Sequence, residues 1–244
     1  MSGYVDLHAH YLAGIDDGAA DIETTRKMVA AVVELGFSRL YATPHQREGL
    51  YLPSPEAIDA AYRQMTDAVQ GMTGVDVEVR LGAENFWDGT FLGRVQAAKI
   101  PSYDSGPAFL FEVPPPLMPP GIETTLFDLR LGGKLPVMAH PERYHAIQAQ
   151  LERAEALGQT AALVVDLAAL DGAHGRAEMK TARELLAHGL AHAAATDIHG
   201  LDDLPRIAAG IGWIRKHLGA DTLRTLLEDN PRRIIAGDLP ETGR

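Results

Sequence analysis

The segment Leu135-Pro136-Val137-Met138-Ala139-His140 decides the fold, because a short apolar run ends abruptly at an imidazole. A run of this length is typical of a strand that is buried on both faces. The same arrangement, an apolar run followed closely by His, Asp or Glu, recurs after Tyr4-Val5, Leu40-Tyr41-Ala42, Val75 to Leu81, Phe109 to Phe111 and Ala191 to Ala195. Polar groups at successive strand ends converge only when the strands lie side by side and parallel, as at the carboxyl face of a β/α barrel.

Nine side chains at these predicted strand ends can bind metal ions: His8, His10, Asp17, His45, Glu84, Glu112, His140, Asp197 and His199. His, Asp and Glu without Cys form the ligand set of hard or borderline divalent ions. Nine ligands exceed what one ion needs. The sequence therefore predicts two or three ions that share a bridging carboxylate.

Two of these motifs place both ligands on one face of a strand, because residues two apart point the same way. They are His8-Ala9-His10 and Asp197-Ile198-His199. Asp6 shares the face of the first pair and could orient a ligand histidine. Each residue also has an ordinary role open to it, such as a turn for Asp17 in Ile15-Asp16-Asp17-Gly18. Their joint placement at strand ends favours the metal site.

Strand-like and helix-like segments alternate along the whole chain. Seven strands are predicted, at Tyr4–His10, Phe37–Thr43, Asp76–Leu81, Ala108–Val113, Leu135–Ala139, Ala162–Leu167 and Leu190–Thr196. Helices are predicted at Ile22–Leu35, Pro55–Gln70, Gly89–Ala98, Thr124–Leu131, Tyr144–Leu157, Thr181–Ala187, Leu204–Leu218, Asp221–Leu227 and Pro231–Ile235. No linker or change in composition divides the chain, so residues 1–244 are expected to form one α/β domain.

Composition excludes several classes of protein. The 244 residues contain no Cys, which rules out disulfides, zinc thiolate sites and a cysteine nucleophile. A net charge of −11 disfavours binding to nucleic acid or to an anionic membrane surface. We find no signal peptide and no apolar stretch long enough to span a membrane, and the absence of Cys fits a reducing compartment, so a cytoplasmic location is expected.

Two arginines near the predicted ligands suit a phosphate group, because a planar guanidinium can contact its oxygens through two donors. Arg143 stands three residues after His140, and Arg47 closely follows His45. The sequence has neither a nucleotide-binding GxxxxGK[ST] loop nor a GxSxG nucleophile motif. The remaining histidines are expected to serve packing or the surface, with no chemistry assigned: His145, His174, His188, His192 and His217.

Six motifs together resemble the polymerase and histidinol phosphatase (PHP) superfamily. They are Asp6–His10, Gly14–Gly18, Ala42–His45, Phe111-Glu112, Ala139–Tyr144 and Thr196–His199, in an order that covers nearly the whole chain. The I-D-D-G and A-H-P-E-R-Y segments resemble those of the bacterial tyrosine-protein phosphatases of capsule and exopolysaccharide operons. The resemblance implies a distorted (β/α)7 TIM-like barrel of the PHP type with a three-metal centre, often manganese, with iron, zinc or magnesium as alternatives.

The resemblance also implies roles for individual residues. One ion would be held by His8, His10, Glu84 and Asp197, a second by Glu84, Glu112 and His140, and a third by Asp17, His45 and His199. Arg143 would hold the phosphoryl oxygens, and Arg47 and Arg206 are counted with it as substrate contacts. The implied reaction is hydrolysis of phosphotyrosine on a protein by a metal-bridging hydroxide. A bacterial tyrosine autokinase of polysaccharide export is the implied partner, and a homo-oligomer is left open.

Three segments depart from the family pattern and affect the expected substrate contacts. Gln46 stands where a second His is common, and Val164–Ala169 replaces a run that tends to carry Gln, Asn and Ser. Leu204 precedes Pro205 where Arg is frequent, and Arg206 follows instead. Other readings therefore stay open. They are a phosphatase of histidinol phosphate or another small phosphoester, an amidohydrolase-like deaminase or lactonase, and an inactive regulatory barrel stabilised by metal.

Overall fold

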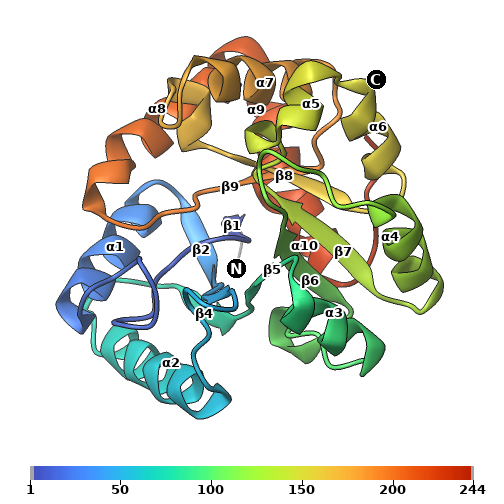
Figure 1. Ribbon diagram of the computed structural model, residues 1–244. Coiled ribbons are helices and arrows are strands. Elements are labelled where there is room, and N and C mark those ends of the chain that lie inside the picture. Colours follow the sequence, from blue (N-terminus) through green and yellow to red (C-terminus); the bar gives the residue numbers. More distant parts are fainter. Residues whose placement is uncertain (1–2, 243–244) are drawn as a thin grey trace.

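The computed structural model describes residues 3–242 and places the strands at the centre, with helices around them (Figure 1). The strands are β1 (Tyr4–Asp6), β2 (Phe37–Ala42), β3 (His45–Gln46), β4 (Glu78–Leu81), β5 (Glu84–Phe86), β6 (Ala108–Glu112), β7 (Leu135–Ala139), β8 (Ala162–Asp166) and β9 (Ala193–Ala195). Every pair of neighbouring strands among them is parallel. The parallel order predicted from the strand ends is therefore confirmed within the described residues.

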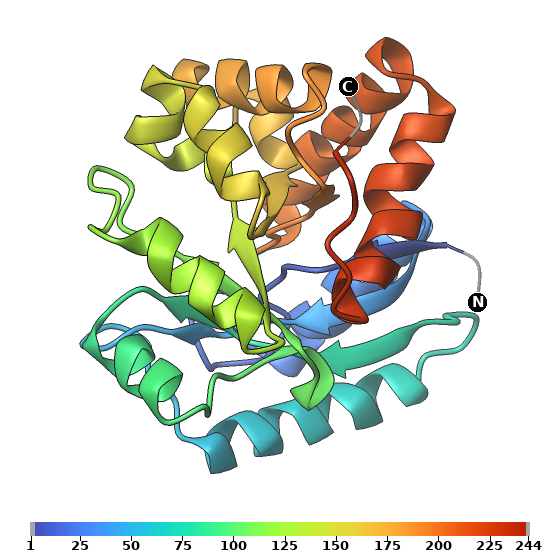
Figure 2. The same ribbon diagram turned by 90° about the vertical axis from the view of Figure 1, so that its right-hand side faces the viewer.

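Helices follow most of the strands and cover the sheet on opposite sides, as the turned view shows (Figure 2). They are α1 (Ile22–Glu34), α2 (Pro55–Gln70), α3 (Gly89–Gln96), α4 (Ile122–Leu131), α5 (His145–Ala149), α6 (Glu152–Gly158), α7 (Arg176–Ala187), α8 (Leu204–His217), α9 (Ala220–Arg224) and α10 (Asn230–Ile235). Short helical turns include η2 (Pro141–Arg143), η3 (Ala168–Asp171) and the π-helical η5 (Thr225–Asp229). None of the helices in residues 3–242 is long and apolar enough to cross a membrane.

The strands form two sheets, with the orders β1-β2-β4 and β3-β5-β6-β7-β8-β9, so the prediction of seven strands is wrong in detail. Two predicted strands, Phe37–Thr43 and Asp76–Leu81, are each followed by a short strand that was not predicted, β3 and β5. Pro44, which has no N–H to donate, separates β2 from β3, and Gly82-Ala83 separates β4 from β5. The path nevertheless continues across both breaks, because Gly82 N–H donates to Ala42 O and Glu84 N–H donates to Pro44 O.

A side chain joins the two sheets where β9 meets β1. The Asp6 carboxylate accepts hydrogen bonds from the Thr196 N–H at 2.9 Å and from the Thr196 hydroxyl at 2.7 Å. Further along, a single parallel bridge links Ala9 to Ile198. A continuous strand ladder is thus absent at this seam, and the described residues form no single closed ladder.

Buried side chains alternate between two apolar clusters along the strands. On β6, Ala108 and Leu110 belong to one cluster, whereas Phe109 and Phe111 belong to the other. Because side chains on one face recur every two residues, Glu112 points to the same side as Ala108 and Leu110. β6 therefore places the Glu112 carboxylate at the end of the cluster that contains Ala108 and Leu110.

Several helix boundaries differ from the prediction for local reasons. The helix predicted at Tyr144–Leu157 is split into α5 and α6, because Gln150 between them is extended. The segment Asp221–Leu227 passes from α9 into the π-helical turn η5. The predicted start of α1 is confirmed, since the Asp21 side chain accepts a hydrogen bond from Thr24 N–H as an N-cap.

Candidate metal centre

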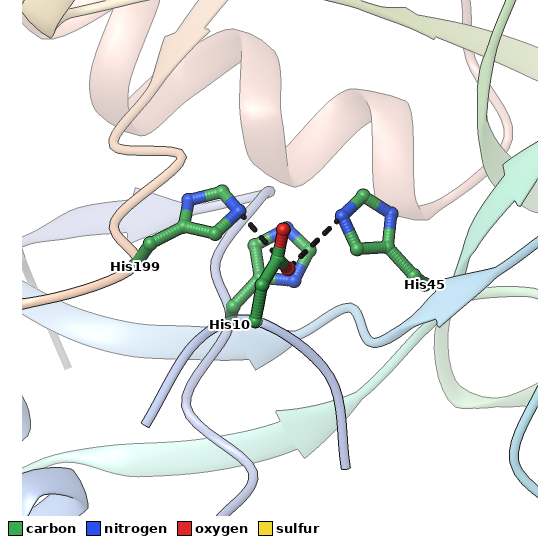
Figure 3. Close-up of side chains that lie close together, drawn as sticks. His10, His45 and His199 are labelled. Atoms are coloured by element: carbon green, nitrogen blue, oxygen red, sulfur yellow. Dashed lines mark ion pairs between the residues drawn. The ribbon is translucent and has the colours of Figure 1, made fainter. Parts of the chain in front are cut away.

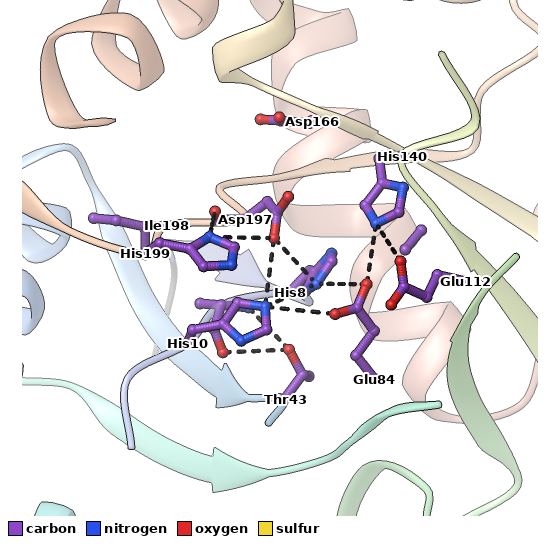
Figure 4. Close-up of polar contacts among 12 residues, drawn as sticks. His8, His10, Thr43, Glu84, Glu112, His140, Asp166, Asp197, Ile198 and His199 are labelled. Carbon is purple, nitrogen blue, oxygen red and sulfur yellow. Dashed lines mark hydrogen bonds and ion pairs between the residues drawn. The ribbon is translucent and has the colours of Figure 1, made fainter. Parts of the chain in front are cut away.

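The nine predicted ligands gather in one cluster, and Figure 4 shows seven of them, Glu84 included. His8 and His10 follow β1, His45 and Glu84 begin β3 and β5, and Glu112 ends β6. Asp17 lies in the loop before α1, His140 follows β7, and Asp197 and His199 follow β9. Their ligand atoms form four overlapping groups, within each of which all atoms lie within 4.8 Å of one another. These groups are His10-Asp17-His45-His199, His8-His140-Asp197, His8-His10-Glu84 and His45-Glu84-Glu112.

Glu84 lies at the centre of this arrangement. Its Oε1 is 3.0 Å from Nε2 of His140 and 3.3 Å from Nε2 of His8. Its Oε2 is 2.8 Å from Nδ1 of His45. One carboxylate thus faces histidines from three strand ends, which is the geometry expected of a ligand shared between ions.

Asp197 faces the first histidine pair from the opposite side. Its Oδ1 lies 3.2 Å from Nε2 of His8 and 3.5 Å from Nε2 of His10, and Figure 4 shows His8 between Asp197 and Glu84. The two histidine nitrogens are themselves only 3.3 Å apart. Two ring nitrogens can lie this close when a proton is shared between them or when both bind one cation.

A second part of the cluster surrounds Asp17. Its Oδ1 is 3.3 Å from Nε2 of His45 and 3.6 Å from Nε2 of His199, the contacts drawn in Figure 3. The ring of His10 stacks on that of His199 with centroids 4.1 Å apart. Asp17 is half-exposed, so this part of the cluster is the one open to solvent.

Electrostatics show that the cluster suits cations. Burial, and then the charge of Glu84, raises the pKa of Glu112 to about 8. Oε2 of Glu84 and Oε1 of Glu112 are buried and accept no well-aligned hydrogen bond from any residue in 3–242, although both face Nδ1 of His45. Buried carboxylate oxygens without a donor are costly unless something positive meets them. The donor set is made only of imidazole and carboxylate groups, so divalent cations fit these residues.

Two of the predicted ligands lie on strained backbone. His140 has φ 35° and Asp197 has φ 47°, in the left-handed region that non-glycine residues rarely adopt. Such outliers cost of order 1–3 kcal/mol each and concentrate at functional sites. Here the turn aims each side chain back into the cluster directly after its strand ends.

The ring of His10, a predicted ligand, is oriented by Asp16, which the sequence placed only in a turn signal. Oδ2 of Asp16 lies 2.8 Å from Nδ1 of His10 and accepts the N–H of His45 at 3.1 Å. A carboxylate on Nδ1 leaves Nε2 free for a metal. Asp6, expected in that role, instead bonds Thr196 and the hydroxyl of Tyr11, because its side chain occupies the seam between β1 and β9.

Arg143 lies beside the cluster and contacts three groups through Nη2. These are Oδ2 of Asp197 at 2.5 Å, Oδ2 of Asp166 at 3.0 Å and Nε2 of His174 at 2.7 Å. Sequence reasoning missed Asp166 and His174. Asp166 ends β8, but the apolar residues on both sides of it gave no sign of a polar site there. His174 lies in a loop, 31 residues from Arg143 in the sequence.

The other two predicted substrate arginines lie elsewhere. The Arg47 guanidinium lies 4.2 Å from the ring centroid of Phe86, a cation–π contact. Arg206 donates to the backbone oxygen of Asp171 at 3.5 Å from an exposed position on α8. Within the described residues neither contacts a predicted ligand, so their roles as substrate contacts stay predictions.

Comparison with known proteins identifies the family. Residues 4–236 match the family described as Capsular polysaccharide synthesis, CpsB/CapC, and the chain belongs to it. Among similar proteins, the tyrosine-protein phosphatase CpsB of Streptococcus pneumoniae is 27% identical over 96% of this chain and 99% of its own length. The tyrosine-protein phosphatase YwqE of Bacillus subtilis is 29% identical over 81% of this chain and 78% of its own.

A solved structure supports the same relationship. It is described as YwqE from Bacillus subtilis and CpsB from Streptococcus pneumoniae, unique metal-dependent tyrosine phosphatases. The TM-score is 0.86 at 25% identity, and the match covers 98% of this chain and 99% of that chain. The resemblance drawn from sequence motifs to capsule-operon phosphatases is thereby confirmed at the level of the family.

Proposed function

We propose that this chain is a metal-dependent protein-tyrosine phosphatase. The observation that carries the proposal is the convergence of nine imidazole and carboxylate side chains on one cluster, which is open to solvent at Asp17, in a chain that belongs to the CpsB/CapC family. The similar proteins are named tyrosine-protein phosphatases, so hydrolysis of histidinol phosphate or another small phosphoester is less favoured. The family description supports a role in capsular polysaccharide synthesis.

We propose that the cluster holds two or three divalent ions, with manganese as the expected metal. The central ion would take His8, His10, Glu84 and Asp197, and a second would take Glu84, Glu112 and His140. A third would take Asp17, His45 and His199. When bound, such ions supply the nucleophile, because they lower the pKa of water from 15.7 to about 7.

The protein's own groups would orient the substrate and stabilise developing charge. Arg143 lies 2.5 Å from the ligand Asp197, so its guanidinium can reach a phosphoryl group held at the cluster. A planar fork of donors matches phosphoryl oxygens and stabilises their charge in the transition state. A phenolate leaving group, with a conjugate-acid pKa of about 10, departs with modest assistance.

We further propose that the strands form a distorted seven-stranded barrel of the PHP type. Support comes from the parallel pairing throughout and from the continuity of β2 with β3 and of β4 with β5. The Asp6 contacts and the Ala9–Ile198 bridge would complete the ring between β9 and β1. The expected protein partner is a phosphotyrosine protein, such as a tyrosine autokinase of polysaccharide export.

A chelator experiment tests the proposed activity. Purified protein should hydrolyse a phosphotyrosine peptide, lose this activity with EDTA and regain it on addition of Mn²⁺. His140→Ala should lower kcat by orders of magnitude while circular dichroism still shows a folded chain. Full activity after exhaustive metal removal would refute the metal-dependent mechanism. Much faster turnover of histidinol phosphate than of any phosphotyrosine peptide would refute the tyrosine assignment alone.

A further inference from the structure

Asp166 is a buried carboxylate at the end of β8 that belongs to none of the four metal-binding groups. Its Oδ1 accepts the N–H of Ala168 at 2.7 Å, which fixes the carboxylate at the start of η3. Its Oδ2 faces Nη2 of Arg143 at 3.0 Å and Nε2 of His174 at 2.6 Å. The carboxylate is thus anchored through Oδ1, and its Oδ2 faces two donor groups at the edge of the candidate metal centre.

The neighbouring carboxyl group, Glu142, supports Asp166 from behind. Glu142 is fully buried, and one of its oxygens accepts the backbone N–H of Asp166. Asp166 itself lies against Arg143, together with Asp197.

The contacts around Arg143 exceed what its nitrogen can donate. Nη2 carries two hydrogens, yet it lies within hydrogen-bond distance of Asp166, Asp197 and His174. Nε2 of His174 also lies close to both Asp166 and Arg143, and a ring nitrogen either donates or accepts. These contacts cannot all be hydrogen bonds at once, so at least two arrangements of the three side chains compete.

We propose that Asp166 positions Arg143 for the phosphoryl group, and that His174 is the alternate donor to Asp166 when Arg143 turns to substrate. The two are positioning residues, since they act through Arg143. A carboxylate that kept Arg143 as its sole partner would hold it back from the substrate. The half-exposed imidazole of His174 keeps the buried charge paired in the second arrangement. The inference rests on the proposed role of Arg143.

Double-mutant cycles with Arg143 test this inference. Asp166→Asn keeps the shape of the side chain and removes its charge, and Asp171→Asn on the exposed side of η3 is the matched control. We expect Asp166→Asn to lower kcat/KM by roughly tenfold in the wild-type background. It should cause almost no further loss in an Arg143→Ala background. Metal content and melting temperature should stay near the wild-type values.

His174→Asn provides the second cycle, with His188→Asn at an exposed position as its control, and covers the case in which Asp166→Asn does not fold. Its loss should be smaller than that of Asp166→Asn and should also vanish without Arg143. Losses that multiply in either double mutant would overturn the proposal. So would a much greater loss on phenyl phosphate than on p-nitrophenyl phosphate, which would make His174 a proton donor. A wild-type protein without metal-dependent turnover, or an Arg143→Ala variant with normal turnover, would instead contradict the proposed function.

Discussion

At the scale of single residues, the contacts of Arg143 explain why this side chain stays charged beside the cluster. Its guanidinium touches two carboxylates that belong to different parts of the molecule, Asp166 on β8 and Asp197 after β9. Their charges outweigh burial and raise the pKa of Arg143 further above its already high value. The group is therefore a permanent cation, and its shape decides which substrate atoms it can hold.

Arg143→Lys keeps the charge and removes the fork of donors. We expect kcat/KM to fall by roughly tenfold or more, about 1.4 kcal/mol, because a charge-assisted contact weakens in the transition state. The loss should be equal for p-nitrophenyl phosphate and for a phosphotyrosine peptide, since both present the same phosphoryl group. Steady-state kinetics on the two substrates measures this, and a loss confined to the peptide would place Arg143 in peptide recognition instead.

His192 is a buried histidine away from the metal centre, and it makes stability depend on pH. Burial lowers its pKa to about 4 from the ordinary histidine value of 6.5, and its Nδ1 accepts the N–H of Leu163. The unfolded chain therefore takes up this proton first as pH falls. The associated stability is fully present above pH 6.5 and is lost between pH 6.5 and about 4, by roughly 3 kcal/mol at most.

His192→Asn removes the titrating group while its amide oxygen can still accept the Leu163 N–H. We expect the unfolding free energy of the variant to fall less steeply than that of the wild type between pH 6.5 and 4. Urea unfolding of both proteins at a series of pH values provides the measurement. Parallel curves would show that His192 does not titrate in this window.

The convergence of the nine predicted ligands could be anticipated at the residue scale because strand ends carry a simple signal. An apolar run followed by His or Glu marks His140 and Glu112 without any knowledge of their neighbours. The residues that support the ligands have no such signal. His174 reaches Arg143 only through the path of the chain after β8, and Asp16 differs from its neighbour Asp17 only in the direction of its side chain.

At the scale of elements, α8 packs so closely on η3 that one glycine is required. A Cβ added to Gly210 would lie 2.1 Å from the backbone oxygen of Leu167, whereas a Cβ on Gly212 would meet nothing within 4 Å. Packing therefore requires a glycine at position 210, whereas the surroundings of Gly212 leave room for a side chain.

We expect Gly210→Ala and Gly212→Ala to change stability in opposite directions. The first forces the helix away from η3 and should cost about 1–3 kcal/mol, as overpacking does. The second should stabilise the chain by about 0.5–1 kcal/mol, because Gly is the weaker helix former. Chemical denaturation measures both, and a stable Gly210→Ala variant would show that this contact yields easily.

Element boundaries were less predictable than element types. The strand Leu135–Ala139 was predicted to the residue, because its apolar run is bounded on both sides. The short strands β3 and β5, which follow Pro44 and Gly82-Ala83, were missed, because neither break indicates whether the chain rejoins a sheet. Tertiary packing decides that: a Cβ on Gly82 would lie 2.9 Å from the ring of Tyr103.

At the scale of the whole molecule, bound ions should link segments from both ends of the chain. The four ligand groups join residues from His8 to His199, so cations that bind only the folded chain must stabilise it. At an ion concentration of about 100 Kd this adds about 2.7 kcal/mol, which corresponds to roughly 5–10 °C in melting temperature for a chain of this size.

Chelation followed by thermal melting should reveal this stabilisation. We expect the apo protein to melt several degrees lower and to regain its melting temperature with Mn²⁺. Elemental analysis of protein prepared without chelator should find two or three ions per chain. Fewer than two ions under metal-replete conditions, with an unchanged melting temperature, would contradict a polynuclear centre.

The seam between β9 and β1 has a consequence for motion. The side chain of Asp6, which bonds the Thr196 N–H, stands where other neighbouring strands share a ladder. Separating β9 from β1 therefore breaks only a few hydrogen bonds, rather than a whole ladder of backbone hydrogen bonds. Amide hydrogens beside the seam, such as that of Thr196, should therefore exchange with deuterated water faster than those buried within β6 and β7. Asp6→Asn should speed this exchange further, so the molecule would open first along a seam that ends at its predicted metal ligands.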